Sequence, residues 1–306
     1  MGRRGNFEQE QIDKSRGLSV YKRDDMVQSA RYKLTVQEQR AVLYCISQIK
    51  AEDTPATEYS FELKDFYAIC GIKKDTYTTT KRMLKALSDR SWWVKNKQTK
   101  KESLVRWFNT IDCDEGSGTV TFKFHERMQP YLLNLLNQDE FYTCYNIKYI
   151  LPMASKHSPR LYEILKSYQK NNKQWFFELT ELKYLLDCAN YERWPDFQRR
   201  VLEPAIDEIN KYTDLCIAYR DIRKGKKVVR IDFFMDKKTN TELRQADGEI
   251  LEALDGQLSM FGDPDTETLK NIIANDEEYQ FFEARRAARK AEEESLQGIK
   301  NWIDRK

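Results

Sequence analysis

Hydrophobic and polar residues follow the same order of spacings twice within the first 240 positions. In the first series, apolar residues at helical spacing in 34–49 precede an alternating, strand-like segment at 59–63. A short helix is predicted at 66–70, and a longer helix follows Asp75, a favourable N-cap residue. Strands are then predicted at 92–94, 105–112 and 119–124, and a helix at 128–136 closes the unit.

The second series starts with alternation over 141–149, which predicts a strand. Ser158-Pro159 predicts a helix start, with Ser158 as the N-cap and Pro159 as the first helical residue. An extended segment at 175–179 precedes a helix that Thr180 is expected to cap. The second series therefore repeats the order of the first up to this helix.

The next helix of the second series is predicted from Phe197 to about Lys211, with a kink at Pro204. Its apolar positions are expected to face the core; they are Phe197, Val201 and Ala205. Two strands, 215–220 and 228–234, then form a hairpin. The tip of this hairpin is the basic run Arg223-Lys224-Gly225-Lys226-Lys227.

A short motif supports an internal pseudo-repeat. Phe61-Glu62-Leu63-Lys64-Asp65-Phe66 resembles Phe177-Glu178-Leu179-Thr180-Glu181-Leu182, and each run ends a strand and enters a short helix. Helix, strand, helix, helix and hairpin is the order of a winged-helix domain. The sequence therefore predicts an α+β chain of two tandem winged-helix domains. We place a flexible N-terminal arm at 1–24, the first domain at 25–140, the second at 141–236 and an acidic, partly disordered tail at 237–306.

Charge divides the chain unevenly. Residues 241–306 contain 9 Lys and Arg against 16 Asp and Glu, a net charge of −7, whereas residues 1–240 carry +10. A basic body with an acidic tail favours a polyanionic partner. No apolar run is long enough for a membrane span, and the polar N-terminus does not resemble a secretory signal. We therefore expect a cytoplasmic protein without a membrane partner.

Cysteine and histidine usage disfavours a metal site. The six cysteines form no CxxC pair, and His125 and His157 are isolated from each other. We expect buried free thiols, which suit a reducing compartment. No metal and no cofactor is predicted.

The helix of the second unit that begins near Asp196 carries the best candidates for contacts with DNA bases. Gln198, Arg199 and Arg200 lie in its first turn, the part of a helix-turn-helix recognition helix that reaches base edges. Arg can donate two bonds to guanine and Gln can pair with adenine. Arg193 is expected to add a phosphate contact. The alternative is an ordinary solvated basic face.

The corresponding helix of the first unit offers hydroxyl and basic side chains suited to phosphates. They are Thr78, Thr79, Lys81, Arg82 and Lys85. A salt-bridged surface helix is the alternative. The two basic tips, 95–101 and 223–227, are predicted to be wings that contact the DNA backbone, unless they serve only solubility. Their candidate residues are Lys97, Lys100, Lys101, Lys224, Lys226 and Lys227.

Enzyme motifs are missing from the sequence. Gly225-Lys226 lacks the upstream Gly and the following Ser or Thr of a phosphate-binding loop. A rolling-circle nickase needs a His-x-His metal site beside a nucleophilic Tyr, and neither histidine has such a partner. Trp92, Trp93 and Trp107 are interpreted as structural residues of a sheet rather than base-stacking residues.

Three stretches resemble the iteron-binding plasmid replication initiators, a family with tandem winged helices. They are Val20-Tyr21-Lys22-Arg23-Asp24-Asp25-Met26-Val27-Gln28-Ser29-Ala30 with Leu34-Thr35-Val36-Gln37-Glu38-Gln39-Arg40, then Ser155-Lys156-His157-Ser158-Pro159-Arg160-Leu161-Tyr162-Glu163-Ile164-Leu165, and Tyr191-Glu192-Arg193-Trp194-Pro195-Asp196-Phe197-Gln198-Arg199-Arg200-Val201-Leu202-Glu203-Pro204-Ala205-Ile206-Asp207-Glu208-Ile209-Asn210. The resemblance covers about residues 20–236 and leaves the tail outside.

The resemblance implies a non-enzymatic protein that starts plasmid replication. Family members bind direct repeats as monomers and open the origin, and their dimers bind an inverted repeat and repress their own gene. The second domain contacts bases, while the first binds more weakly and supplies the dimer surface. Arg199 and Arg200 match basic family positions, whereas Gln198 stands where a basic residue is common.

The expected partners follow from the same resemblance. They are double-stranded origin and operator DNA, a second copy of the chain, and the host replication initiator and helicase machinery. Two other functions stay open. One is a winged-helix transcriptional repressor, which should not melt adjacent AT-rich DNA, and the other is an origin-nicking enzyme.

Overall fold

The computed structural model describes residues 19–50, 53–63, 66–67, 77–95, 101–133, 135, 141–170 and 172–261. Its first half contains β1 (Ser19–Arg23), α2 (Asp24–Ser29), α3 (Val36–Ser47), β2 (Tyr59–Glu62), α5 (Tyr77–Asp89), β3 (Ser91–Lys95), β4 (Glu102–Arg106), β5 (Phe108–Asp114), β6 (Thr119–Phe124) and α6 (Gln129–Leu132). Its second half contains β7 (Tyr142–Asn146), η1 (Ile147–Tyr149), α7 (Ser158–Gln169), β8 (Gln174–Glu178), α8 (Leu179–Leu185), α9 (Trp194–Phe197), η2 (Gln198–Leu202), α10 (Glu203–Tyr212), β9 (Leu215–Lys224), β10 (Lys227–Lys237) and α11 (Asn240–Phe261).

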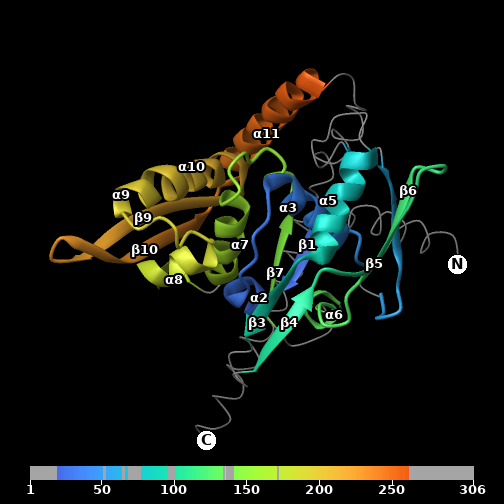
Figure 1. Cartoon of the computed structure of the whole chain (residues 1–306). Helices are drawn as coiled ribbons and strands as arrows, with labels where there is room; N and C mark the ends of the chain where they lie inside the picture. Colours follow the sequence, from blue (N-terminus) through green and yellow to red (C-terminus); the bar gives the residue numbers. More distant parts are fainter. Residues whose placement is uncertain are drawn as a thin grey trace, which may run out of the picture.

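The two units share one sheet topology. In the first, the strands are ordered β2-β6-β5, and in the second β8-β10-β9, with antiparallel pairing throughout. In the first unit β2 pairs with β6, the second strand of the β5–β6 hairpin. In the second unit β8 pairs in the same way with β10, the second strand of the β9–β10 hairpin. Figure 1 shows the β9–β10 hairpin extending away from the first unit, with α7 between the two sheets. The predicted pair of winged-helix domains is confirmed.

The start of the described chain is a strand and not a flexible arm. β1 pairs antiparallel with β7, from Ser19 opposite Asn146 to Arg23 opposite Tyr142. Val20 is fully buried, and the unpredicted helix α2 follows directly. The expected flexible arm at 1–24 is thus wrong for residues 19–24, and residues 1–18 lie outside the described part.

A separate two-stranded sheet, β3–β4, replaces part of a predicted long strand. The segment 105–112 was expected to be continuous, but the chain turns at Trp107, which is fully buried and packs against Trp92 at 4.5 Å between ring centroids. The topological counterpart of the β9–β10 wing is therefore the β5–β6 hairpin. The basic segment 95–101 lies between the paired strands β3 and β4 and is not that counterpart. Its predicted contact with the DNA backbone stays a prediction.

Two predicted helix caps are also wrong. Ser158 is the first helical residue of α7, its hydroxyl is buried without a hydrogen bond, and His157 precedes it in a helical conformation. Thr180 lies inside α8, which starts at Leu179. Thr35, in contrast, forms a full capping box with Glu38 at the start of α3.

The tail begins with an ordered helix. α11 packs its Ala246, Ile250 and Leu254 side chains into the body, and Asp247 pairs with the buried Lys148 at 2.9 Å. Lys211 of α10 pairs with Glu249 at 3.1 Å. Residues 240–261 of the expected tail thus form a helix, and residues 262–306 lie outside the described part. Within the described ranges, no helix is long and apolar enough to cross a membrane.

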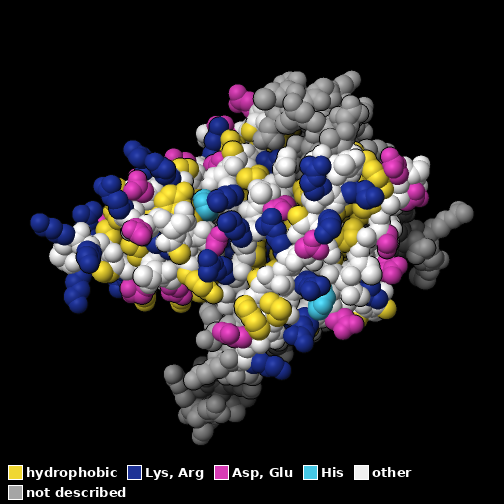
Figure 2. Space-filling model, viewed as in Figure 1, with side chains coloured by type: hydrophobic (Ala, Val, Ile, Leu, Met, Phe, Trp, Pro, Cys, Tyr) yellow, Lys and Arg dark blue, Asp and Glu magenta, His cyan; other side chains and the backbone are white. Residues whose placement is uncertain are grey.

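The β9–β10 wing turns through Gly225. This residue has φ of +64°, a backbone conformation that glycine adopts without the steric cost of a Cβ atom. The predicted hairpin is confirmed, with longer strands than expected. Figure 2 shows Lys and Arg side chains gathered at the tip of this wing.

Cysteine burial differs from the expectation at two positions. Cys45, Cys144 and Cys188 are buried and form no disulfide, as expected. Cys113 is half-buried, since it lies on the same face of β5 as Ile111 at the margin of the core, and Cys216 is exposed at an outward position of β9. Cys70 lies outside the described residues.

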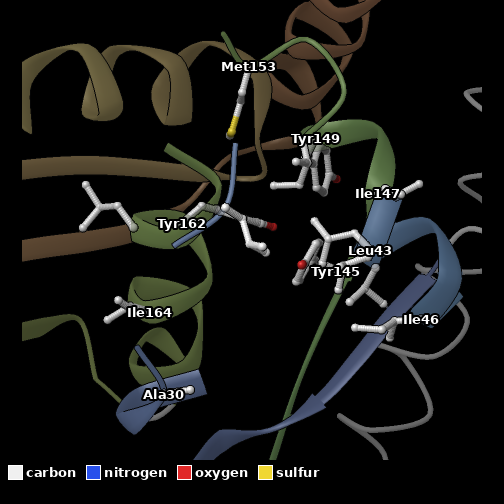
Figure 3. Packing of buried hydrophobic residues seen from close by; sticks show 14 of the residues in the cluster. Ala30, Leu43, Ile46, Tyr145, Ile147, Tyr149, Met153, Tyr162 and Ile164 are labelled. Atoms are coloured by element: carbon white, nitrogen blue, oxygen red, sulfur yellow. The ribbon is translucent and has the colours of Figure 1, made fainter. Parts of the chain in front are cut away.

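Aromatic residues of β7, η1 and α7 meet in the core between the two units. Tyr145 packs edge-on against Tyr162 at 5.3 Å between ring centroids, and Tyr149 contacts the same ring (Figure 3). A charged cluster lies beside them. Glu163 of α7 accepts bonds from Lys22 and Tyr145 and, at 3.2 Å, from the Tyr32 hydroxyl. The Glu163–Lys22 pair thus joins α7 to β1 inside the core.

The pKa of Glu163 records this pairing. Burial alone would raise it, but Lys22 and Arg160 hold the pKa below its ordinary value of 4.5. The folded state therefore gains stability from the ionised carboxylate. This contribution is fully present above pH 4.5 and is lost as the pH falls through the lower folded pKa.

We predict that Lys22→Met lowers the free energy of unfolding by about 3–5 kcal/mol at neutral pH, because a buried carboxylate loses its main counter-charge. Urea denaturation measures the change. The double variant Lys22→Met/Glu163→Met should recover only part of the loss, since it removes the uncompensated carboxylate but also takes Glu163 away from the buried Arg160, which keeps its bond to the Ala30 carbonyl. A single variant as stable as the parent would contradict the prediction.

We also predict that two truncations differ. Ending the chain after residue 261 should leave the melting temperature unchanged, because the described contacts of α11 with the body all remain. Ending it after residue 239 should lower the free energy of unfolding by roughly 3 kcal/mol or more, since Ile250 and Leu254 lose their buried surface. Equal melting temperatures for both truncations would show that α11 contributes nothing.

Candidate DNA-binding interface

The predicted recognition helix is a composite of α9, η2 and α10. Phe197, Val201 and Ala205 are fully buried on its inner side, as the sequence predicted. Arg199 and Arg200 are exposed on its outer side. The apolar face anchors the segment to the unit and leaves both guanidinium groups in solvent.

The middle of this segment is a π-helical turn. The backbone N–H of Glu203 donates to the carbonyl of Gln198, a bond five residues long. Pro204 has no N–H and cannot donate the ordinary helical hydrogen bond to the carbonyl of residue 200. Loss of this bond favours the change from four-residue to five-residue backbone hydrogen bonds at this point of the helix. The change takes the form of a widened turn that contains both arginines, and the kink predicted at Pro204 stays a prediction.

Three charged side chains surround the start of the segment. Arg193 and Arg199 lie 4.0 Å and 3.9 Å from carboxylate oxygens of Asp196 and are 79% and 72% exposed. Ion pairs this exposed contribute little to the stability of the fold, so both arginines can leave Asp196 for a phosphate or a base at a small cost in free energy. Arg193 precedes α9, where a phosphate contact was expected.

Gln198 lies differently from the two arginines. Its amide nitrogen donates to Glu203 Oε1 at 2.9 Å and to the Tyr219 hydroxyl at 2.9 Å. The side chain is half-buried between the π-turn and β9. To form the predicted adenine contact, the Gln198 side chain would have to break its hydrogen bonds with Glu203 and Tyr219.

The β9–β10 wing presents an exposed basic tip. Lys224, Lys226 and Lys227 are all exposed, and Arg223 is 57% exposed with Asp221 at 2.7 Å. Flexible lysines at a hairpin tip suit phosphate contacts along a DNA backbone.

Sequence reasoning missed an organised pair of arginines on the same hairpin. Asp232 is almost fully buried and bonds Arg230 at 2.8 Å and Arg220 at 3.2 Å. Arg230 lies over the Phe176 ring, and Arg220 over that of Phe234. The alternation along β10 places Asp232 on the outward face of the sheet. Its burial could not be predicted from that pattern, because Asp232 lies opposite Phe176 of β8 and Arg220 of β9.

The first unit presents its candidates on one exposed face of α5. Thr78, Thr79, Lys81, Arg82 and Lys85 are all exposed, while Thr80, Leu84 and Leu87 face the core. Lys85 pairs with Asp89 at 2.5 Å, and Lys81 lies 5.3 Å from the Tyr77 ring centre. This face is compatible with phosphate contacts.

The β5–β6 hairpin, which corresponds to the basic wing, has an acidic tip. Asp114 accepts bonds from the Ser117 hydroxyl and the Gly116 N–H, and these bonds lower its pKa. With Glu115 beside it, the tip carries negative charge that disfavours a phosphate contact. Lys101 is exposed at the start of β4, while Lys97 and Lys100 lie outside the described residues.

One cysteine–histidine pair lies near the junction of the units. Cys188 Sγ is 3.5 Å from His157 Nδ1, but burial lowers the pKa of His157 to about 4 and raises that of Cys188 to about 12. A neutral thiol beside a neutral imidazole is not an activated nucleophile. No group of three metal-ligating side chains occurs among the described residues.

Two family models match the chain in tandem. The model for the first winged helix of initiator replication proteins covers residues 19–166, and the model for the second winged helix of initiator Rep proteins covers residues 178–235. The chain belongs to the initiator Rep protein family. The first match includes both partners of the β1–β7 pairing, and the domain division at 140/141 stays a prediction.

One curated protein and one solved structure are similar to this Rep protein. The PI protein of Escherichia coli is 23% identical over 146 residues, 43% of this chain and 47% of that protein, so the match spans about half of the relative's length. The crystal structure of Pi initiator protein in complex with iteron DNA superposes with a TM-score of 0.56 at 19% identity. The superposition covers 73% of this chain and 99% of that one, which shows a common fold.

We predict that Arg200→Ala weakens specific DNA binding by about 1–3 kcal/mol and relaxes the preference at one or two base pairs. The reason is its exposure within the π-turn of the recognition segment. Competition binding against duplexes with single base-pair changes measures both effects. An equal loss on specific and random DNA would instead indicate a phosphate contact.

We predict that charge reversal of Lys81, Arg82 and Lys85 together flattens the slope of log K against log salt by roughly 2–3 units, since each phosphate contact contributes ~0.9. Base preference should stay nearly the same, and the footprint should shorten at one end only. An unchanged slope with a full-length footprint would show that α5 does not contact DNA.

Proposed function

We propose that this Rep protein initiates plasmid replication by binding directly repeated sites at its origin. The observation that carries the proposal is the exposed arginine pair in the π-turn beside a basic wing, in a chain with two winged helices. The iteron DNA held by the Pi initiator protein, which has the same fold, supports the kind of site.

The two units take different parts in this proposal. The second unit contacts bases through Arg199 and Arg200 and phosphates through its wing. The first contacts phosphates through α5, since the hairpin that corresponds to the wing is acidic. Binding by both units distorts the duplex, and no enzymatic step is required.

The proposal includes further partners and a location. A homodimer binds an inverted repeat and represses the protein's own gene, and the host initiator and helicase are recruited to the opened origin. These steps take place in the bacterial cytoplasm.

Footprinting on DNA flanking the protein's own gene tests the proposal. We expect regularly spaced protected direct repeats, and permanganate reactivity in adjacent AT-rich DNA once the repeats are occupied. Protection of an inverted repeat alone, without melting, would favour a repressor. Site-specific nicks in supercoiled DNA with Mg²⁺ or Mn²⁺ would favour a nicking enzyme.

A further inference from the structure

Two sets of hydrogen bonds join the recognition segment to the first strand of the wing. At the far end of α10, Asn210 donates to the carbonyl of Ile217 at 2.9 Å and accepts from the Ile217 N–H at 2.6 Å. At the near end, Gln198 and Glu203 meet the hydroxyl of Tyr219, two residues further along β9. The recognition segment and the wing are therefore bonded at both ends.

The near set depends on the π-turn. Gln198 and Glu203 are five residues apart, and side chains at that spacing do not face each other on an ordinary α-helix, where neighbours are three or four residues apart. The wider turn brings them together, so that Gln198 Nε2 reaches Glu203 Oε1 at 2.9 Å. The turn that carries Arg199 and Arg200 is closed by its own flanking side chains.

Tyr219 completes this arrangement from the wing. Its hydroxyl accepts from Gln198 at 2.9 Å and donates to Glu203 at 3.4 Å. Burial raises the pKa of Tyr219, so the hydroxyl stays protonated at neutral pH. All three side chains are half-buried, which sets them apart from the exposed arginines between them.

We propose that Gln198, Glu203 and Tyr219 form a positioning tether that holds Arg199 and Arg200 at a fixed distance from the wing, and that Gln198 contacts no base. The inference rests on the proposed function, because it assigns the wing to phosphates and the π-turn to bases. With the tether intact, the π-turn and the wing are already placed to contact one duplex together. Binding then costs no further conformational entropy for fixing one relative to the other.

Two single variants and their combination test the tether. Tyr219→Phe removes the hydroxyl and keeps the ring, and Gln198→Met removes the amide and keeps the length. Each should lower affinity for the specific duplex about three- to tenfold, the effect of lost hydrogen bonds. The double variant should lose no more than either single one, because both break the same tether. Tyr168→Phe, a half-buried tyrosine of the same unit that lies on α7, is the matched control and should bind like the parent.

Two readouts separate positioning from base contact and from simple destabilisation. The salt slope should fall by about one unit in both tether variants, as a wing phosphate contact of ~0.9 is lost. Preference at every base pair should stay as in the parent, and the melting temperatures should match that of Tyr168→Phe. Relaxed preference at one base pair in Gln198→Met alone would overturn the proposal, as would parental affinity in Tyr219→Phe or additive losses. If the parent protein shows no preference for repeated sites, the proposed function fails before the variants are compared.

Discussion

The buried carboxylate of Glu163 is the constraint on which the arrangement of the two units depends. It lies on α7, the helix that follows the first sheet and precedes the second, and takes bonds from Lys22 of β1 and Tyr145 of β7. A buried carboxylate is tolerated only when its hydrogen-bonding and charged partners are in place. Because Lys22 and Tyr145 are those partners, β1 and β7 must pair in the observed register. The strand that looked like a free arm is held in the core by an electrostatic requirement of a helix far along the chain.

Further ion pairs along α7 extend this constraint toward the second unit. Lys166 pairs with the buried Asp214 at the start of β9, and Lys170 pairs with Asp24 at the start of α2 at 2.8 Å. One helix therefore binds the N-terminal segment on one side and the wing strand on the other. Arg31 adds a surface link, since it bonds Asp187 after α8 at 2.6 Å and lies over the Tyr184 ring. The ion pairs thus connect the wing strand of the second unit, through α7, to the N-terminal segment.

Local pattern was sufficient for most elements but not for their long-range pairing. Helical spacing located α3, α5, α7 and α10, and alternation with a glycine turn located β9 and β10, because these signals arise within one element. The β1–β7 pair and the break at Trp107 depend on contacts between distant segments, so no local period reveals them. At the candidate site, exposure of Arg199 and Arg200 followed from the apolar face opposite them. The hydrogen bonds of Gln198 did not, since its partner Tyr219 belongs to β9 and the π-turn changes the spacing between Gln198 and Glu203.

The shared topology of the two units makes their difference in charge informative. Both have a hairpin in the same position, yet one tip holds Asp114 and Glu115 and the other Lys224, Lys226 and Lys227. A common fold therefore does not imply common contacts with DNA. Phosphate attraction at one hairpin and repulsion at the other would orient the molecule on a duplex before any base is contacted, because such forces act over about a Debye length. Under the proposed function, charge would thus set the direction in which the protein lies on a repeat, and the arginines of the π-turn would select the repeat that it occupies.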